Sequence, residues 1–275
     1  MLWIEEQCPR NCHNAESLGV SNQMFRRDSN GELNGRTETE KETLTSLLNF
    51  HRLNLDNFGR DWNFHTNVTM QRQTLSRVLH YNYLYQKILN TPGVILEFGV
   101  QFGATLSLLM SLRGIYEPFN HRRHIVGFDT FEGFKAPNKM RDGDAWQEQD
   151  YRVPEGYEDA LEKVLDLHEL NCPISNLKKF TLVKGDASET VPQWVEENPH
   201  AIIALAIFDM DLYQPTKDAL KAIKPLLTKG SVLVFDELNV AQFPGETEAV
   251  RELLSTSNVR LQRTQFSPNS AWMEW

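Results

Sequence analysis

The chain has 275 residues, of which 40% are hydrophobic and 24% charged, and its 28 basic and 37 acidic residues give a net charge of −9. This composition is ordinary for a globular protein, and the negative charge disfavours binding to the phosphates of nucleic acids. The longest purely apolar run, Ala201 to Phe208, is far shorter than the roughly 20 residues of a membrane-spanning helix. We therefore expect no nucleic acid partner and no membrane partner.

Residues 1–40 are polar and show no apolar period, so we predict a poorly ordered leader. The leader has early acids and lacks the basic and then apolar pattern of a secretion signal, which favours a cytoplasmic location. Three cysteines are too few for a secreted disulfide framework. Cys8, Cys12 and His13 have a spacing that metal ligands can show, but no second ligand pair accompanies them, so a zinc site is disfavoured.

Two helices are predicted between residues 41 and 90. Four leucines indicate a short amphipathic helix: Leu44, Leu47, Leu48 and Leu53. Apolar residues recur on one face of a second helix over about residues 71–89, and Pro92 with Gly93 ends it. We predict that residues 41–90 form an N-terminal helical cap that packs on the domain, and a homodimer or a higher homo-oligomer would form through the same helices.

Strands and helices alternate from Gly93 onward. Predicted strands cover residues 94–98, 124–129, 180–186, 202–211 and 230–237, and helices separate them. Nearly continuous Val, Ile and Leu strands indicate a parallel sheet that is covered on both faces. The chain end differs, because residues 258–266, a turn and residues 271–275 predict an antiparallel hairpin. We therefore predict a Rossmann-like α/β domain over residues 91–275.

Glu97, Gly99 and Gly103 follow the first predicted strand. In an open α/β sheet the ligand lies outside the carboxyl ends of the strands, and glycines there let the backbone turn beside a cofactor. The segment lacks the central glycine of G-x-G-x-x-G and the Lys-Ser/Thr pair of a P-loop. A nucleoside cofactor without a pyrophosphate is therefore favoured, and the alternative is that these glycines serve only a tight turn.

Asp129 and Asp186 end the second and third predicted strands. An acid at the second strand end commonly binds the ribose hydroxyls of a nucleoside cofactor, so we assign that role to Asp129. Asp186 would lie along the adenine edge. For both residues the alternative is a helix N-cap, and that alternative is stronger for Asp186 because Asp-x-Ser is a capping pattern.

Four acids follow the fourth and fifth predicted strands: Asp209, Asp211, Asp236 and Glu237. In the usual strand order these strand ends are neighbours, so the carboxylates would repel one another. Hard oxygen ligands suit magnesium, calcium or manganese, and a divalent ion would let the acids coexist in a cleft. The alternative is that one or two of them cap helices and the others are solvated.

Four motifs occur in order: Glu97-Phe-Gly-Val-x-x-Gly103, Phe128-Asp129-Thr-Phe-Glu132-Gly133, Asp209-x-Asp211-Leu-Tyr213-x-Pro-Thr216 and Phe-Asp236-Glu237. Together they resemble the macrocin O-methyltransferase-like family of class I methyltransferases over roughly residues 70–250. The resemblance implies a mostly parallel Rossmann-like sheet with S-adenosylmethionine as cofactor. It implies cofactor contacts from Glu97, Gly99, Gly103, Asp129, Phe131, Asp186 and Asp209. It also implies magnesium on Asp209, Asp236 and Glu237, and catalytic roles for Asp209 and Asp211.

The resemblance has two departures. Many relatives carry Asp where this chain has Glu237, which is still an oxygen ligand but reaches further. Sugar-methylating relatives are expected to have a histidine base after the second strand, whereas residues 135–156 contain no histidine. That segment offers acids instead, namely Asp142, Asp144, Glu148 and Asp150. The identity of the general base therefore stays open.

We expect an S-adenosylmethionine-dependent methyltransferase that carries out metal-assisted O-methylation of a small hydroxylated molecule, such as a sugar or a natural-product intermediate. One alternative is a Rossmann oxidoreductase with a nicotinamide cofactor, which the missing glycine and the terminal hairpin disfavour. Another is a non-catalytic relative, which the intact strand-end acids disfavour. The acceptor, the choice between O- and N-methylation and the need for the metal stay open.

Overall fold

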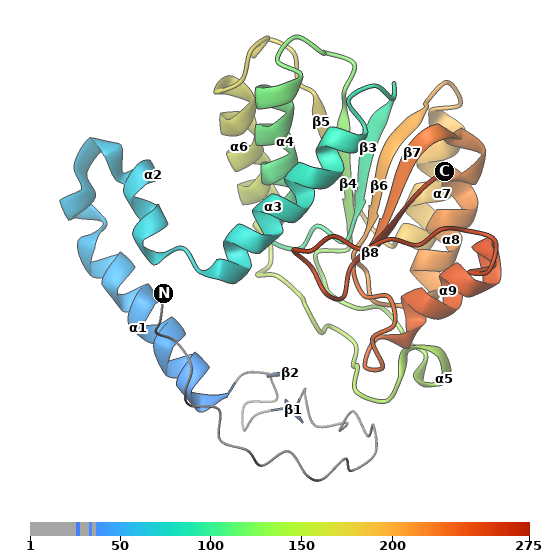
Figure 1. The fold of residues 1–275 in the computed structure, drawn as a ribbon, viewed down its shortest axis with the longest axis horizontal. Helices are drawn as coiled ribbons and strands as arrows, with labels where there is room; N and C mark the ends of the chain where they lie inside the picture. The colour runs from blue at the N-terminus through green and yellow to red at the C-terminus, as the bar shows by residue number, and fades with distance from the viewer. Residues whose placement is uncertain (1–25, 28–32, 35–36) are drawn as a thin grey trace, which may run out of the picture. The chain divides into compact units, whose positions relative to one another are not determined.

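The computed structural model describes residues 26–27, 33–34 and 37–275, and the chain divides into two compact units, Met1–Thr69 and Met70–Trp275 (Figure 1). Most of the predicted leader, including Cys8, Cys12 and His13, lies outside the described residues. Within the described ranges, no helix has the length and apolar character that crossing a bilayer requires.

The first unit contains short elements and one longer helix. β1 (Arg26–Arg27) pairs antiparallel with β2 (Leu33–Asn34), and α1 (Glu38–Asn54) is followed by η1 (Asp56–Asp61), α2 (Trp62–His65) and η2 (Thr66–Thr69). Thr37 caps α1 together with Glu40 in a reciprocal capping box. None of these four helices has a buried side chain. The predicted leucine helix is therefore α1, and association of copies through it stays a prediction.

The second unit is built on one six-stranded sheet of order β5-β4-β3-β6-β7-β8. Its parallel strands are β3 (Val94–Phe98), β4 (Ile125–Asp129), β5 (Phe180–Lys184), β6 (Ile203–Phe208) and β7 (Leu227–Phe235). β8 (Ala271–Glu274) runs antiparallel beside β7, as predicted for the chain end. The first arm of the predicted hairpin contributes a single bridge, Gln262 to Trp272, so β8 takes most of its pairing from β7.

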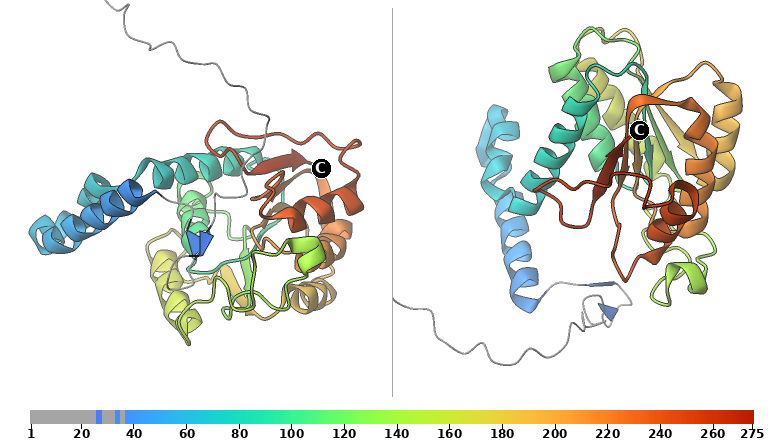
Figure 2. Two further views of the ribbon diagram at one scale, coloured as in Figure 1. Left: turned by 90° about the horizontal axis from the view of Figure 1, so that it is seen from below. Right: turned by 45° about the vertical axis from the view of Figure 1, so that its right-hand side comes forward.

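Helices cover both faces of this sheet (Figure 2). One face carries α3 (Arg72–Lys87), α4 (Ala104–Tyr116) and α6 (Tyr157–Leu170), and the other carries α7 (Ala187–Glu197), α8 (Tyr213–Ile223) and α9 (Pro244–Leu254). The short α5 (Lys139–Asp142) lies in the loop after β4, and η3 (Lys224–Leu226) follows α8. The second helix of the predicted cap is α3, which belongs to the second unit and packs on its sheet.

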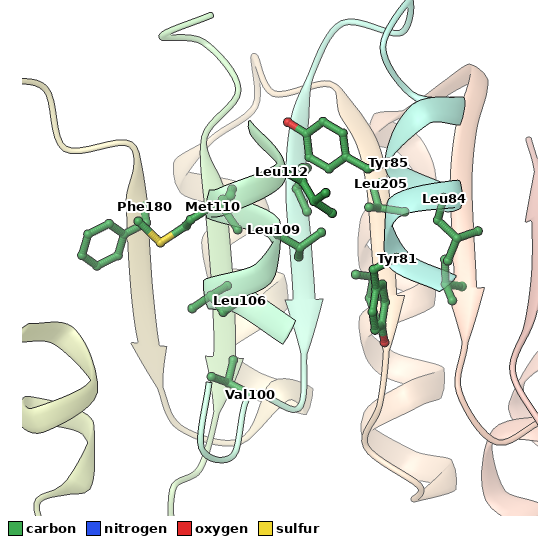
Figure 3. Close-up of a cluster of buried hydrophobic side chains, with 14 of the residues drawn as sticks. Tyr81, Leu84, Tyr85, Val100, Leu106, Leu109, Met110, Leu112, Phe180 and Leu205 are labelled. Atoms are coloured by element: carbon green, nitrogen blue, oxygen red, sulfur yellow. The ribbon is translucent and has the colours of Figure 1, made fainter. Parts of the chain in front are cut away.

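Apolar side chains of α3 explain why that helix joins the sheet domain. Tyr81, Leu84 and Tyr85 are fully buried and lie beside Leu205 of β6, while Leu109 of α4 completes the layer (Figure 3). Truncation of one large side chain in such a layer typically costs about 2–5 kcal/mol. The packing fixes the side of α3 that faces the sheet, and with it the polar residues on the same helical face.

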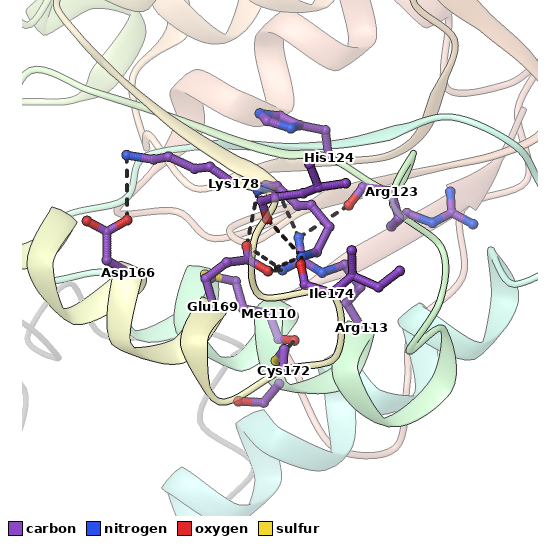
Figure 4. Close-up of polar contacts among 12 residues, drawn as sticks. Met110, Arg113, Arg123, His124, Asp166, Glu169, Cys172, Ile174 and Lys178 are labelled. Atoms are coloured by element: carbon purple, nitrogen blue, oxygen red, sulfur yellow. Dashed lines mark hydrogen bonds and ion pairs between the residues drawn. The ribbon is translucent and has the colours of Figure 1, made fainter.

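A cluster of buried charges closes the amino ends of the strands (Figure 4). It comprises Arg113, Glu117, Arg123, Glu169 and Lys179, which we call the amino-end cluster. The Arg113 guanidinium donates two hydrogen bonds to the Glu169 carboxylate, at 2.9 and 2.8 Å, and a third to the Lys179 carbonyl at 2.7 Å. Arg123 pairs with Glu117 at 2.8 Å. Every acid in this cluster therefore faces a cation.

Candidate active site

A cavity of about 580 Å³ lies at the carboxyl ends of the parallel strands. It is lined by most of the residues that the sequence assigns to a site: Glu97, Gly99, Asp129, Asp186, Asp209, Asp211, Asp236 and Glu237. Gly103 and Phe131 do not line it. Gly103 starts α4 at φ 78°, and a Cβ there would lie 2.3 Å from the side chain of Leu161. Phe131 is buried in the apolar core.

Gly99 lets the end of β3 approach the end of β6 closely. Its φ is 93°, and a Cβ at this position would lie 1.8 Å from the carbonyl oxygen of Asp209. A larger residue therefore cannot occupy the turn without separating β3 from β6. The glycine is needed for packing in the turn, and the same turn exposes backbone to the cavity.

The Asp129 carboxylate closes that turn. Its Oδ2 accepts hydrogen bonds from the backbone N–H groups of Val100 and Gln101, both at 2.7 Å, and its Oδ1 accepts one from Phe131 at 2.6 Å. A carboxylate offers about four acceptor positions, so roughly one stays open toward the cavity. Asp129 thus organises the turn instead of capping a helix, and Phe131 contributes through its backbone.

Asp186 does cap a helix. Its side chain accepts a hydrogen bond from the backbone of Ser188 at 2.9 Å and so begins α7, which was the alternative considered for this residue. It also lines the cavity. The cap therefore fixes the position of a carboxylate at the far end of the site from Asp236.

Asp209, Asp211, Asp236 and Glu237, which we call the acid cluster, meet at the ends of β6 and β7. Burial, together with repulsion from Asp209, raises the pKa of Asp236 to about 7. Burial, with repulsion from Asp236 and Asp209, raises the pKa of Glu237 to about 8. Burial and its acidic neighbours raise the pKa of Asp211 well above its ordinary value. Like charges therefore lie close together here, whereas each acid of the amino-end cluster faces a cation.

Asp211 occupies a strained turn. Its φ is +61°, and the N–H of Leu212 bonds back to the carbonyl of Met210 at 2.6 Å. Asp142 fastens the turn from the loop before α6, because its Oδ1 accepts the N–H of Tyr213 at 2.6 Å. Among the described residues, none donates a hydrogen bond to the Asp211 carboxylate, which lines the cavity. The turn therefore presents Asp211 to a ligand.

Arg77 is a site residue that sequence reasoning missed. From α3 its Nη2 donates to Oδ2 of Asp209 at 3.0 Å, and its Nη1 lies 3.8 Å from Oδ2 of Asp236. Its Nε and Nη2 also donate to Oγ1 of Thr105, at 3.1 and 2.8 Å. The available signal was its place one turn before Tyr81 on the apolar face of α3, where a charged residue requires a partner.

Unpartnered polar atoms gather around the acid cluster. Within the described residues, six buried side-chain polar atoms lack a hydrogen-bond partner. Four of these atoms belong to residues whose pKa is raised in part by the charge of Asp209: Tyr81, Glu97, Glu237 and Glu246. Buried polar groups of this kind normally have a partner, so the concentration at one place indicates a site for a polar ligand.

The residue types of the acid cluster suit a divalent ion, but their arrangement in this structure does not form a metal site. Carboxylate oxygens are the donors that Mg²⁺ prefers, and the unpartnered Oε2 of Glu237 is one of them. In the part of the chain that the structure describes, no three acids, histidines or cysteines are arranged to hold a metal. Asp209 and Asp236 are instead paired with Arg77, so binding of an ion would require that pairing to open.

Comparison with known proteins agrees with this layout. A sequence model described as macrocin O-methyltransferase (TylF) matches residues 32–265. The structure of CalS11, a calicheamicin methyltransferase, has a TM-score of 0.81 and 41% identity, and the match covers 87% of this chain and 94% of that one. A second CalS11 structure, described as an apo TDP-rhamnose 3'-O-methyltransferase, has a TM-score of 0.75 and 38% identity over 87% and 96%.

Two more distant matches extend the comparison. The O-methyltransferase NovP shares the fold, with a TM-score of 0.57 and 16% identity over 72% of this chain and 79% of that one. A curated relative from Streptomyces olivaceus, 8-demethyl-8-(2,3-dimethoxy-α-L-rhamnosyl)-tetracenomycin-C 4'-O-methyltransferase, is 24% identical over 195 residues, which are 65% of this chain and 65% of the relative. The match thus spans less than two thirds of that relative's length.

The predicted class I methyltransferase fold and the predicted resemblance are both confirmed, and the relatives are described as methyltransferases rather than as oxidoreductases. The match to the family model covers most of the described sheet domain, and the relative with 41% identity covers nearly the same length. The chain belongs to the macrocin O-methyltransferase family.

Proposed function

We propose that the chain is an S-adenosylmethionine-dependent O-methyltransferase that acts on a sugar hydroxyl of a natural-product intermediate. The observation that carries the proposal is one cavity in which Glu97, Gly99 and Asp129 face Asp209 and Asp211. CalS11 is described as acting on TDP-rhamnose, and the relative from Streptomyces olivaceus as acting on a rhamnosylated tetracenomycin. We therefore propose a deoxysugar as the acceptor, either as a nucleotide sugar or already attached to its aglycone.

The β3 side of the cavity suits the cofactor. Glu97 is buried, and its Oε2 has no hydrogen-bond partner among the described residues. Burial, with repulsion from Asp209, raises the pKa of Glu97 well above its ordinary value, and an ammonium group in contact with it would reverse that shift. The open acceptor position of Asp129 suits a ribose hydroxyl, and Asp186 lies toward the adenine end. S-adenosylmethionine would supply an electrophilic methyl group.

The β6 side of the cavity suits the acceptor. Asp211 would take the proton of the acceptor hydroxyl, because its carboxylate is unpartnered and its raised pKa moves it toward the range of a general base. The acceptor oxygen would then form a bond to the methyl carbon as the carbon–sulfur bond breaks, and the products would be S-adenosylhomocysteine and a protonated Asp211. Alignment of the two reactants in this cavity would lower the barrier further.

We also propose that a divalent ion takes part in the reaction. Asp209, Asp236 and Glu237 would hold it, and it would supply Lewis acidity toward the acceptor oxygen. Support comes from the concentration of carboxylates and the unpartnered Oε2 of Glu237.

Calorimetric titration with S-adenosylhomocysteine, followed by transfer of a labelled methyl group to TDP-rhamnose or to a rhamnosylated aglycone, tests the proposal. Wild type is expected to bind the cofactor product and to label one of the two acceptors. Glu97→Gln is expected to weaken cofactor binding, whereas Asp211→Asn should retain binding and lose transfer. Absence of cofactor binding by the wild type would refute the proposed function.

A further inference from the structure

Arg77 takes the position that a cation needs at the acid cluster. Its guanidinium contacts Oδ2 of Asp209 at 3.0 Å and lies 3.8 Å from Oδ2 of Asp236. These are two of the three carboxylates that the proposed function assigns to a divalent ion. An ion between them would stand beside the guanidinium, and two cations at such a distance repel each other strongly in a partly buried site.

Other buried polar atoms of the site lack a hydrogen-bond partner. Glu246 is fully buried, and its Oε2 accepts the N–H of Glu237 at 3.1 Å while its Oε1 has no partner in the described chain. Oε2 of Glu237 is likewise unpartnered. The hydroxyl of Tyr81, with no exposed surface, also lacks a partner beside the acids. A single guanidinium therefore leaves this site short of partners, which a hydrated ion would supply.

Arg77 is more exposed than the two carboxylates that it contacts. Its side chain is 42% exposed, whereas those of Asp209 and Asp236 are 26% and 18% exposed. It also has other contacts at hand, since Thr105 accepts two of its N–H groups and the Tyr81 ring centroid lies 5.2 Å from its Cζ. A long side chain on a fixed helix can keep these contacts and give up the two carboxylates.

We propose that Arg77 and a divalent cation are mutually exclusive partners of Asp209 and Asp236. The guanidinium holds the two carboxylates in the ion-free chain, and an ion binds only as Arg77 moves away. Arg77 thus sets the affinity of the site for the ion. The inference rests on the metal site of the proposed function and is independent of the acceptor.

Binding of Mn²⁺, followed by its electron paramagnetic resonance signal and by competition with Mg²⁺, tests this inference. The informative variant is Arg77→Met, which replaces the unbranched stem of the side chain with one of similar shape and removes the charge. Arg77→Lys keeps the charge. The matched control is Arg141→Met, because Arg141 is similarly exposed at 47%, pairs with Glu248 at 2.6 Å and lies over the ring of Tyr213.

Removal of the competing charge is expected to tighten Mn²⁺ binding by Arg77→Met about tenfold or more, whereas Arg77→Lys and Arg141→Met should stay near wild type. In chelator, Arg77→Met should melt below wild type, and Mn²⁺ should restore its melting temperature. If Arg77→Met unfolds in chelator, Mn²⁺ is expected to refold it.

Equal Mn²⁺ affinity in Arg77→Met and wild type would overturn the inference, and so would an equal gain in Arg141→Met. Failure of Arg77→Met to bind Mn²⁺ or to fold with it would do the same. Titration with S-adenosylhomocysteine in parallel separates the two proposals. If the wild type does not bind S-adenosylhomocysteine, the proposed function is wrong. The Mn²⁺ affinities still decide the role of Arg77 in that case.

Discussion

Both ends of the parallel strands carry buried acids. At the amino ends each acid is paired with a cation, whereas at the carboxyl ends the acids lie close to one another. In the amino-end cluster, Glu169 has Arg113 and Lys179, and hydrogen bonds from these cations lower its pKa although burial alone would raise it. In the acid cluster, burial and like charges raise the pKa of Asp236 and of Glu237. The cation present there is Arg77, paired with Asp209 and Asp236.

The difference separates charges that serve the fold from charges that serve a ligand. A fully paired buried cluster has no remaining capacity for a partner, and its loss is felt in folding. An unbalanced cluster in a cavity gains its missing partners from what binds there, and strongly perturbed groups of this kind concentrate at functional sites. Substitutions in the two clusters test this distinction.

The largest effect is expected at the amino-end cluster. Arg113→Met would leave Glu169 buried with one cation fewer, and removal of one member of a buried pair typically costs about 3–5 kcal/mol. Denaturant unfolding measures the loss. Arg122→Met, at an exposed arginine nearby, is the control and should change stability by less than about 0.5 kcal/mol. A loss below about 1 kcal/mol in Arg113→Met would show that the pair is dispensable.

In the acid cluster the large effect should fall on turnover. Asp211→Asn removes the proposed base, and loss of a general base lowers the rate by about a hundredfold or more. The free energy of unfolding should stay equal or rise, because one repelling carboxylate is removed. Asp144→Asn, at an exposed acid of the loop before α6, should leave turnover unchanged. Equal losses in the two variants would contradict the assignment of Asp211.

Much of the contrast between the two clusters can be predicted from the sequence, and part of it cannot. The acids at strand ends were predictable because apolar runs locate the strands, and parallel strands bring their carboxyl ends to one edge. Arg77 was not, because its partner Asp209 is 132 residues away and no local motif links them. An amphipathic face does not identify its partner either: α3 packs on the sheet of the second unit, whereas α1 lies in the first unit and has no buried side chain.

Turn residues show the same limit at shorter range. Gly99, Gly103 and Phe131 all lie in motifs that suggest the cofactor, yet only Gly99 lines the cavity. Gly103 packs against Leu161 and Phe131 enters the core, so both support the turn from behind. Adjacent positions in a turn point in different directions, and the pattern of residue types does not say which one faces the ligand.

Mild acid should act on the acid-cluster side of the molecule before the amino-end cluster, with opposite contributions from His80 and from the acids. Burial, and then the charge of Arg77, lowers the pKa of His80 from 6.5 to about 4. The unfolded chain therefore binds a proton more readily than the fold does, and the contribution of His80 to stability should fall as the pH drops from 6.5 to 4, by at most about 1.4 kcal/mol per pH unit. Asp236 and Glu237 act in the opposite sense, because their raised pKa values of about 7 and about 8 let the fold take up protons before the unfolded chain does. Their contribution to stability should therefore grow over the same pH range. Glu169 and Glu117, whose pKa values are lowered, keep their contribution until the pH falls below their ordinary range.

Histidine titration by NMR assigns this effect. Arg77→Met should raise the pKa of His80, because one of the two causes of its depression is removed. The pKa of His124, which burial and Arg113 lower at the other end of the strands, should not move. A shift of both histidines would mean that the variant loosens the whole sheet domain.

The smallest effect is expected at Asp142, a paired acid that lies beside the unpaired ones. Its Oδ1 accepts the N–H of Tyr213 and its Oδ2 that of Asn138, at 2.6 and 2.7 Å, so both of its oxygens have a partner. These partners are backbone groups and not cations, and burial still raises the pKa of Asp142. Asp142→Asn keeps one acceptor oxygen and should cost about 1–2 kcal/mol. Because Asp142 holds the turn that carries Asp211, its loss should raise KM for the acceptor several-fold more than it lowers kcat. A collapse of kcat that matches Asp211→Asn would instead make Asp142 part of the proton transfer, and pairing would then no longer distinguish the two kinds of buried acid.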